Sequence, residues 1–170
     1  MSAYLSVDTL FVECLVLVLR CILYLVVLCI LLAISLIDAE TMLIPDKLNL
    51  ALLVCGILAV FFVPEVSLDS RLVGFFCISI PLLLFSLVIP GSFGGGDIKL
   101  MAAAGFLLGW QGIFLAAILG LSVGGVYGVY LIVTGKKRAS EHFALGPSLC
   151  IGIALAMLLG STLMRSAMLL

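Results

Sequence analysis

Acidic side chains gather at two places in a chain of which only 10% is charged. The first is the stretch SLIDAETMLIPDKLNL, which holds Asp38, Glu40 and Asp46. The second is GSFGGGDIKL, in which Asp97 follows three glycines. Carboxyl groups can act as a general acid or a general base, so these two stretches are the first candidates for a site that does chemistry.

Two carboxyl groups held close together do not ionise independently, because the charge on the first opposes the second and one group keeps its proton. The ionised member can take a proton from water as the water attacks a peptide carbonyl. The protonated member can bind the developing oxyanion or donate to the leaving amine. If Asp38 and Asp97 meet, they can cleave a peptide bond without a metal or another cofactor.

The glycines before Asp97 have a physical reason of their own. Gly94, Gly95 and Gly96 permit positive φ and close backbone approach, so an extended substrate can lie against this loop. As the first residue of a helix, Asp97 would also lie at the favourable end of the macrodipole. A plainer alternative stays open, in which Asp97 only caps a helix and the other acidic residues are ordinary interfacial charges.

The rest of the chain is apolar and must position these side chains within a membrane. Hydrophobic residues make up 65% of the 170 residues, which is more apolar surface than a soluble domain of this length can bury. A net charge of -1 without a charged tail indicates no nucleic-acid partner and leaves the lipid bilayer as the environment. The six cysteines lie in apolar runs and match neither a metal site nor a disulfide framework.

Uncharged runs predict an all-α bundle of about six transmembrane helices, in a single domain that covers residues 1–170. A spanning helix needs about 20 mostly apolar residues. The run 100–135 would be roughly 54 Å long as one helix, so it must fold back, and GWQG at 109–112 is the best turn. The predicted spans are 13–37, 48–63, 72–89, 97–109, 112–134 and 143–164.

Lysine and arginine predict the orientation of these spans. The loops that hold Lys47, Lys99 and the basic run 136–138 fall on one side, which is therefore predicted to be cytoplasmic. Arg71 and the C-terminal arginine fall on the other side. Lys99 either pairs with Asp97 or only marks the cytoplasmic side. Both candidate aspartates fall at the cytoplasmic edge of the membrane, where they can meet.

Two blocks of the sequence resemble the type IV prepilin peptidases, the aspartic membrane proteases that remove the leader of type IV prepilins and type II secretion pseudopilins. In SLIDAETMLIPDKLNL, the family's Asp is followed seven to eight residues on by Leu/Ile-Pro-Asp, as Asp38, Pro45 and Asp46 are here. In GGGDIKLMAAAGFLLGW, the family's Gly-x-Gly-Asp and later Lys correspond to Gly94, Gly96, Asp97 and Lys99.

A third segment, FALGPSLCIG, resembles the family's Phe-Gly-Pro before its last helix, with Leu145 in place of the usual aromatic residue. The resemblance covers nearly the whole chain from about residue 30. It implies that Asp38 and Asp97 are catalytic, and that Pro45, Asp46, Lys99 and the glycines 94–96 support them.

The resemblance also implies the substrate and the location. The substrate would be a prepilin or pseudopilin with its short basic leader in the cytoplasm and its apolar helix in the bilayer, cut after a glycine at the junction. The enzyme would lie in the bacterial cytoplasmic (inner) membrane with its active site facing the cytoplasm. Glu40 and Asp46 would attract the basic leader.

One departure concerns N-methylation. Longer bacterial members carry a cytoplasmic domain with two Cys-x-x-Cys pairs between their first two helices, and they methylate the new N-terminus with S-adenosylmethionine. No Cys-x-x-Cys occurs in this sequence. We therefore expect peptidase activity without strong methyltransferase activity.

Other classes of protein remain as alternatives. Archaeal preflagellin peptidases and presenilin-like proteases share the Gly-x-Gly-Asp motif, but the Ile-Pro-Asp block and the Gly-Trp ending fit the bacterial prepilin enzymes better. A small ion or solute transporter would use intramembrane carboxylates, yet no polar residue near the midplane continues a pathway from Asp38 and Asp97. A non-catalytic membrane subunit of a pilus or secretion machine would keep working without either aspartate.

Overall fold

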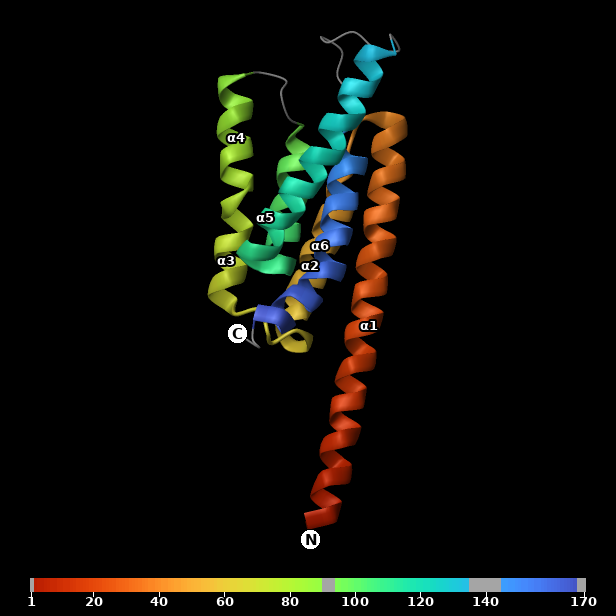
Figure 1. Cartoon of the computed structure of the whole chain (residues 1–170), viewed down its shortest axis with the longest axis vertical. Coiled ribbons are helices and arrows are strands. Elements are labelled where there is room, and N and C mark those ends of the chain that lie inside the picture. The colour runs from red at the N-terminus through yellow and green to blue at the C-terminus, as the bar shows by residue number, and fades with distance from the viewer. Residues whose placement is uncertain (1, 90–93, 135–144, 168–170) are drawn as a thin grey trace.

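The computed structural model describes residues 2–89, 94–134 and 145–167, and helices account for nearly all of them. In chain order the helices are α1 (Ser2–Thr41), α2 (Asp46–Phe62), α3 (Leu68–Cys77), α4 (Ser79–Val88), α5 (Gly95–Val133) and α6 (Gly146–Ala167). Figure 1 shows them side by side and roughly parallel to one long axis. No strand occurs in these three described ranges, which confirms the predicted all-α fold.

The helices are those of a membrane protein. Three stretches are long and apolar enough to cross a membrane, namely Leu10–Thr41, Leu68–Val88 and Gly95–Tyr130. Large apolar side chains cover their outer surfaces, as is expected of helices that face lipid, and Leu25 and Leu84 are more than half exposed. The chain is therefore a polytopic membrane helix bundle, while the number of six spans stays a prediction.

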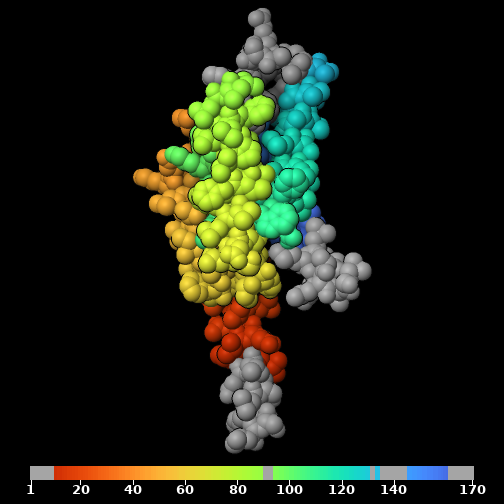
Figure 2. Space-filling view, turned by 90° about the vertical axis from the view of Figure 1, so that its left-hand side faces the viewer, coloured from red at the N-terminus to blue at the C-terminus, as the bar shows by residue number. Residues whose placement is uncertain are grey.

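Helix α1 is longer than the predicted span 13–37, because it begins at Ser2 and continues to Thr41. Arg20 Nη1 lies 2.6 Å from Glu65 Oε1, in the connection between α2 and α3, where α1 reaches the end of the bundle. The part of α1 before Arg20 projects beyond the other helices (Figure 1 and Figure 2). At the other end, the additional turn places Asp38 inside the helix instead of after it.

Helix α2 begins at Asp46, two residues before the predicted start. Pro45 occupies the position before the helix with φ -65° and ψ 128°, an extended conformation that suits its fixed ring. Asp46 lies in the first turn, where a carboxylate interacts favourably with the helix macrodipole. The helix ends at Phe62, shortly before Pro64, which has no N–H to continue it.

The predicted span 72–89 is interrupted, because α3 ends at Cys77 and α4 begins at Ser79. Pro81 explains the break, since its ring crowds the carbonyl of Cys77 four residues earlier and it has no N–H to donate there. Helix α4 lies at the edge of the bundle, with only Ser79 and Leu82 buried. Figure 2 shows α3 and α4 forming one long outer face.

Helix α5 contains the reversal, at Gly109 within the segment GWQG where the sequence predicts a turn. Gly109 has φ 74° and ψ 174°, so the helical backbone is interrupted there. Positive φ is a conformation that glycine adopts without a steric penalty. The break divides α5 into a first leg, residues 95–108, and a second leg, residues 110–133. Figure 1 shows the first leg descending toward the start of α3 and the second leg rising again.

Contacts along α5 agree with this reversal. Gly109 lies against Ser70, at the start of α3, whereas Gly96 at the other end of the first leg lies against Ile44, just before the start of α2. The second leg returns to the same end as Gly96, because Gly124 lies against Ser148 near the start of α6. The starts of α2, α5 and α6 therefore share one end of the bundle with the C-terminal end of α1.

Glycines allow the first leg of α5 to pack tightly on α3. A Cβ on Gly105 would overlap the carbonyl of Gly74, and a Cβ on Gly74 would overlap the carbonyl of Gly105. The second leg meets α6 in the same way, because a Cβ on Gly152 would overlap the backbone of Gly120. Small residues let membrane helices approach closely enough for dispersion contacts, so these two crossings hold α5 in the centre of the bundle.

Arg71 lies in the interior at the end opposite Asp38, with 0% of its surface exposed. Its guanidinium makes five hydrogen bonds to backbone carbonyls, at 2.8–3.2 Å, and the acceptors are Ala59, Val63, Val66, Phe106 and Leu107. Carbonyls at the C-terminal ends of helices have no intrahelical partner. Arg71 therefore joins the end of α2 to the end of the first leg of α5. The sequence suggests a charge at the membrane surface, whereas the structure buries this side chain.

Helix α6 corresponds to the predicted last span 143–164, and its described bounds are Gly146–Ala167. Residues 143 and 144 and the basic run 136–138 lie outside the described residues, as does His142. The orientation inferred from that basic run therefore stays a prediction.

Candidate active site

Asp38 points into the bundle from the last full turn of α1. The buried face of α1 carries apolar residues three or four positions apart, and Asp38 follows Leu31 and Ile34 on that face. Only 5% of Asp38 is exposed. Its Oδ2 atom accepts a hydrogen bond of 2.9 Å from the backbone N–H of Gly146, the first residue of α6. The N-terminal end of a helix favours a carboxylate.

Gly146 is required for this contact. A Cβ built on Gly146 would lie 2.5 Å from Asp38 Oδ2 and 2.8 Å from Asp38 Cγ, which is closer than such atoms approach. Only glycine lets the N-terminus of α6 come this near to the carboxyl group. The segment FALGPSLCIG, which resembles the family's block before the last helix, therefore contributes directly to the environment of Asp38.

Asp97 is the third residue of α5, in its first turn, and not the first residue as predicted, because the helix begins at Gly95. Its Oδ2 atom accepts a hydrogen bond of 3.2 Å from the backbone N–H of Gly94, while its own N–H donates to the Gly94 carbonyl. This is one half of a capping box, in which the side chain of the third helical residue accepts from the N–H of the residue before the helix; Gly94 has no side chain to supply the other half. Asp97 therefore caps α5, as the plainer alternative expects.

Capping uses only one oxygen of Asp97. The other oxygen, Oδ1, is buried and receives no hydrogen bond from any residue in the described ranges. A buried carboxyl oxygen without a donor is costly, at about 1–3 kcal/mol or more. Such an atom is typical of a group that meets its partner only when a ligand or a reacting molecule is present.

The structure brings Asp38 and Asp97 together from helices far apart in the sequence. They lie close enough for the charge of Asp38 to act on Asp97, and both act on Cys150 in the second turn of α6. Each carboxyl group has its Oδ2 atom held by one backbone N–H at a helix N-terminus, Gly146 for Asp38 and Gly94 for Asp97. The pair thus has fixed positions and a free acceptor oxygen on Asp97.

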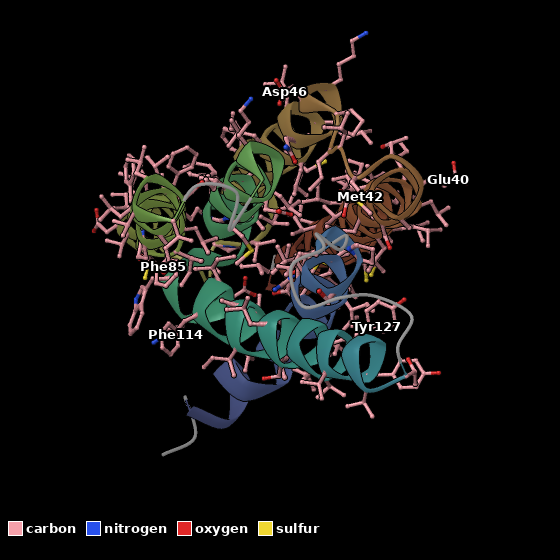
Figure 3. All side chains as sticks on the ribbon, turned by 90° about the horizontal axis from the view of Figure 1, so that it is seen from above. Glu40, Met42, Asp46, Phe85, Phe114 and Tyr127 are labelled. Carbon is pink, nitrogen blue, oxygen red and sulfur yellow. The ribbon has the colours of Figure 1, made fainter. Side chains whose placement is uncertain are left out.

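Lys99 pairs with Asp46 and not with Asp97. Its Nζ atom lies 2.8 Å from Asp46 Oδ1 and 2.9 Å from Asp46 Oδ2. Both side chains are more than half exposed, so this ion pair contributes little to stability. It does connect the first turn of α2 to the first turn of α5. Asp46 is consequently a less available charge for a basic leader than the exposed Glu40, which lies apart from it at this end of the bundle (Figure 3).

The three glycines before Asp97 differ from the expectation of positive φ. Gly94, Gly95 and Gly96 all lie within the described ranges, and none of them has positive φ. Close approach does occur at Gly96, where a Cβ would lie 2.8 Å from Ile44 Cβ, whereas a Cβ on Gly95 would meet nothing within 4 Å. Gly96 therefore serves packing against the connection between α1 and α2, which leads through Pro45 into α2.

The connection between α1 and α2 is short and strained at one residue. Met42 has φ 53°, a conformation that is uncommon for a residue with a side chain. Thr41 supports the turn, because its Oγ1 donates to the Ile37 carbonyl at 2.8 Å and accepts from the Leu43 N–H at 3.3 Å. This turn connects the end of α1, which carries Asp38, to the start of α2, and its Leu43 side chain is exposed.

Sequence reasoning missed two residues of this site. In the sequence, Gly146 stands out only as part of the segment FALGPSLCIG that resembles the family. Asn49 interrupts the apolar run of the second span, is 5% exposed, and donates from Nδ2 to the Gly96 carbonyl at 3.3 Å. A polar residue inside a membrane span is a functional candidate by default, so that signal was present in the sequence. Among the described residues, no three His, Cys, Asp or Glu side chains gather as candidate metal ligands.

Comparisons with known proteins agree with the two motif blocks. Residues 25–129 match the profile of the type IV leader peptidase family. The chain is 34% identical over 143 residues to the prepilin leader peptidase/N-methyltransferase of Aeromonas salmonicida, and the match covers 80% of this chain and 48% of that protein. It is 36% identical over 141 residues to the protein of the same name from Pseudomonas aeruginosa, covering 80% of this chain and 49% of that one.

A more distant relative is the prepilin leader peptidase/N-methyltransferase of Bacillus subtilis, 29% identical over 126 residues, with 74% of this chain and 51% of that protein covered. The chain thus spans about half the length of the curated relatives that it matches. No solved structure matches it significantly. With the family profile spanning most of the bundle, and with the relatives' identity extending over four fifths of the chain, this protein belongs to the type IV leader peptidase family.

Proposed function

We propose that this protein is an aspartic endopeptidase that removes the leader of type IV prepilin-like proteins, with Asp38 and Asp97 as its catalytic pair. The observation that carries the proposal is the proximity of these two carboxyl groups, near enough for one charge to act on the other and each held by one backbone N–H, with Asp97 Oδ1 buried and without a donor among the described residues. A structural cap alone would need neither the second carboxyl group nor the free oxygen.

In the proposed reaction, one carboxyl group is ionised and the other is protonated. The ionised group takes a proton from a water molecule, and the water oxygen forms a bond to the carbon of the scissile carbonyl. The protonated group donates a hydrogen bond to the oxygen of the tetrahedral intermediate. The C–N bond then breaks as a carboxyl proton passes to the leaving nitrogen, which gives a new carboxyl end on the leader and a new amine on the mature protein.

The proposed substrate is an apolar helix that begins with a short basic leader, consistent with the names of the relatives. The proposed location is the bacterial inner membrane, with the aspartate end of the bundle at the cytoplasmic face. Exposed Glu40 is the acidic group best available to a basic leader, since Asp46 is paired with Lys99. Weak or missing methyltransferase activity stays a prediction, which incubation of the protein with S-adenosylmethionine and cleaved substrate would test.

Co-expression with a candidate prepilin tests the proposal. Asp38→Asn and Asp97→Asn keep the size of each side chain, and we expect each to abolish leader removal, measured as the mass of the prepilin. Asp69→Asn is the matched control, because Asp69 is an exposed acidic residue in the first turn of α3, at the other end of the bundle. The control is expected to cleave as the unchanged protein does.

The alternatives predict other results. If both aspartate variants cleave as well as the unchanged protein, the proposed pair is wrong. If no prepilin is cleaved by any variant, while both aspartate variants still support pilus or secretion assembly, a non-catalytic subunit is the better account. A transporter would show movement of an ion or solute that depends on the aspartates, without any change in the mass of a prepilin.

A further inference from the structure

Asn49 is a buried polar residue that contacts the backbone of the candidate site. It lies in the first turn of α2, and its Nδ2 atom donates to the carbonyl of Gly96. Gly96 directly precedes Asp97, so this hydrogen bond holds the peptide unit that carries the aspartate. Burying a polar amide in an apolar bundle costs free energy unless its hydrogen bonds are made, and within the described ranges the Asn49 side chain makes one, to this peptide.

The other half of the Asn49 amide is left without a partner. Two buried side-chain atoms in the described ranges receive no hydrogen bond, and they are Asn49 Oδ1 and Asp97 Oδ1. Both atoms are acceptors. Asn49 donates to the Gly96 carbonyl and Asp97 directly follows Gly96, so this hydrogen bond links the two residues that carry them. A donor with two hydrogens, such as a water molecule, can serve two acceptors at once, and buried water is found where polar atoms provide two to four hydrogen bonds.

Asn49 is one of three contacts at this junction. Gly96 packs against Ile44, in the connection that leads into α2, so closely that a Cβ would overlap it, and the exposed side chains of Lys99 and Asp46 form an ion pair. The start of α5 is therefore joined at three points to α2 and the residues just before it, and Asn49 is the most buried polar residue among them. A displacement of about 1 Å at a reacting group can reduce a rate by about a hundredfold, so this junction matters for the geometry of Asp97.

We propose that Asn49 positions Asp97 and the water that Asp97 activates: its Nδ2 atom fixes the Gly96 carbonyl, and its Oδ1 atom is a second acceptor for that water. A water that donates one hydrogen to Asn49 Oδ1 and the other to Asp97 Oδ1 directs a lone pair away from both, toward a scissile carbonyl. The inference rests on the proposed function.

Purified enzyme with a prepilin substrate, in detergent, tests this role through kcat and KM. Asn49→Leu has similar volume and removes both polar atoms, and we expect kcat to fall roughly 10- to 100-fold while KM changes less than about twofold. Asn49→Ser keeps one hydroxyl, which can replace only one of the two interactions, and is expected to fall between Asn49→Leu and the unchanged protein. If Asn49→Leu does not fold, the kcat and KM of Asn49→Ser test the proposal instead.

Ser79→Ala is the matched control, because Ser79 is a buried polar residue in α4 whose hydroxyl donates to the Phe75 carbonyl, away from the aspartates. It is expected to lower the thermal unfolding temperature without changing kcat per folded molecule. If folded Asn49→Leu or Asn49→Ser lowers only the unfolding temperature and keeps the kcat of the unchanged protein, Asn49 is a packing residue and the inference is wrong.

Asp38→Asn and Asp97→Asn, measured in the same series, separate the two claims. If they lose cleavage while the Asn49 variants keep it, the proposed function holds and the Asn49 inference fails. If they cleave as the unchanged protein does, the catalytic pair itself is wrong, and the role of Asn49 that depends on it is overturned with it.

Discussion

The buried charged groups at the two ends of this bundle differ in how completely they are hydrogen-bonded. At one end the guanidinium of Arg71 has five N–H groups and makes five hydrogen bonds to carbonyls, so all of its donors are used. At the other end Asp97 uses one oxygen to cap a helix and leaves the second buried without a donor in the described ranges. A completely satisfied charge holds helices together, whereas an incompletely satisfied one keeps an acceptor to which a further donor can bind, as the proposed reaction requires.

The comparison also separates two kinds of helix end. Carbonyls at the C-terminal ends of α2 and of the first leg of α5 attract a cation, and N–H groups at the starts of α5 and α6 attract carboxylates. The alternation of helix direction through the bundle gathers the N-terminal ends of α2, α5 and α6 around the aspartates. The pair of aspartates at one end and the hydrogen bonds of Arg71 at the other thus both follow from the same arrangement of helices.

The largest effect on stability is expected at Arg71. Arg71→Met keeps an apolar side chain of similar length but removes all five hydrogen bonds to the helix-end carbonyls. Ala59 and Val63 still accept from a backbone N–H, whereas a buried carbonyl left without any donor costs about 1–3 kcal/mol. Because removal of a buried charge also relieves its desolvation cost, we expect a net loss of about 3 kcal/mol, measured by chemical denaturation in detergent.

Arg20→Met is the matched control for Arg71→Met, since Arg20 forms a partly exposed ion pair with Glu65 at the same end of the bundle. Such pairs contribute about 1 kcal/mol or less. Equal losses for the two arginine variants would contradict the structural role assigned to Arg71. Cleavage per folded molecule is expected to change in neither variant, because both residues lie at the end opposite the aspartates.

At the acidic end, Gly146→Ala is expected to reduce cleavage about a hundredfold. The new Cβ would lie 2.5 Å from Asp38 Oδ2 and must displace either the carboxyl group or the start of α6, and misplaced reacting groups lose rate steeply. The measurement is the rate of leader removal per folded molecule. Gly125→Ala, where a Cβ meets nothing within 4 Å, is the control and should cleave at the unchanged rate. Full activity of Gly146→Ala would show that the Gly146 contact does not position Asp38.

The smallest effect is expected at Asp46. Asp46→Lys places a positive charge beside Lys99 at the acidic end, so we expect the KM for a prepilin with a basic leader to rise about two- to fivefold with little change in kcat. Added salt should reduce the difference, because exposed charges are screened. Asp69→Lys makes the same change at the other end and should leave KM as it is. An unchanged KM in Asp46→Lys would remove Asp46 from leader recognition.

Much of the acidic end could be predicted from the sequence. Charge-free runs and the length limit of a membrane helix required a reversal near Gly109, and the resulting alternation put Asp38 and Asp97 at one end. The break at Ile78 was also foreseeable, because Pro81 lies four residues after Cys77 and proline disturbs a helix at that distance. These features depend on local composition and on the order of elements along the chain.

The basic end could not be predicted in this way. In the sequence, Arg71 looks like an interfacial charge. Its partners are backbone carbonyls of α2, the following connection and α5, and every residue type has such a carbonyl, so the sequence does not reveal them. The partner of Lys99 was missed for a related reason, since Asp97 is near in sequence while Asp46 is near in space. Contacts that depend on how helices cross are decided by packing, which periodicity does not encode.

The central claim is that Asp38 and Asp97 act as one unit, and the cleavage rates of Asp38→Asn, Asp97→Asn and the double variant test it most directly. Each single variant should lose about a thousandfold or more in kcat, within the range for general acid–base groups. The double variant should be nearly as active as the worse single variant, because residues that act together are strongly non-additive. Single variants that retain the rate of the unchanged protein, or losses that multiply in the double variant, would contradict it.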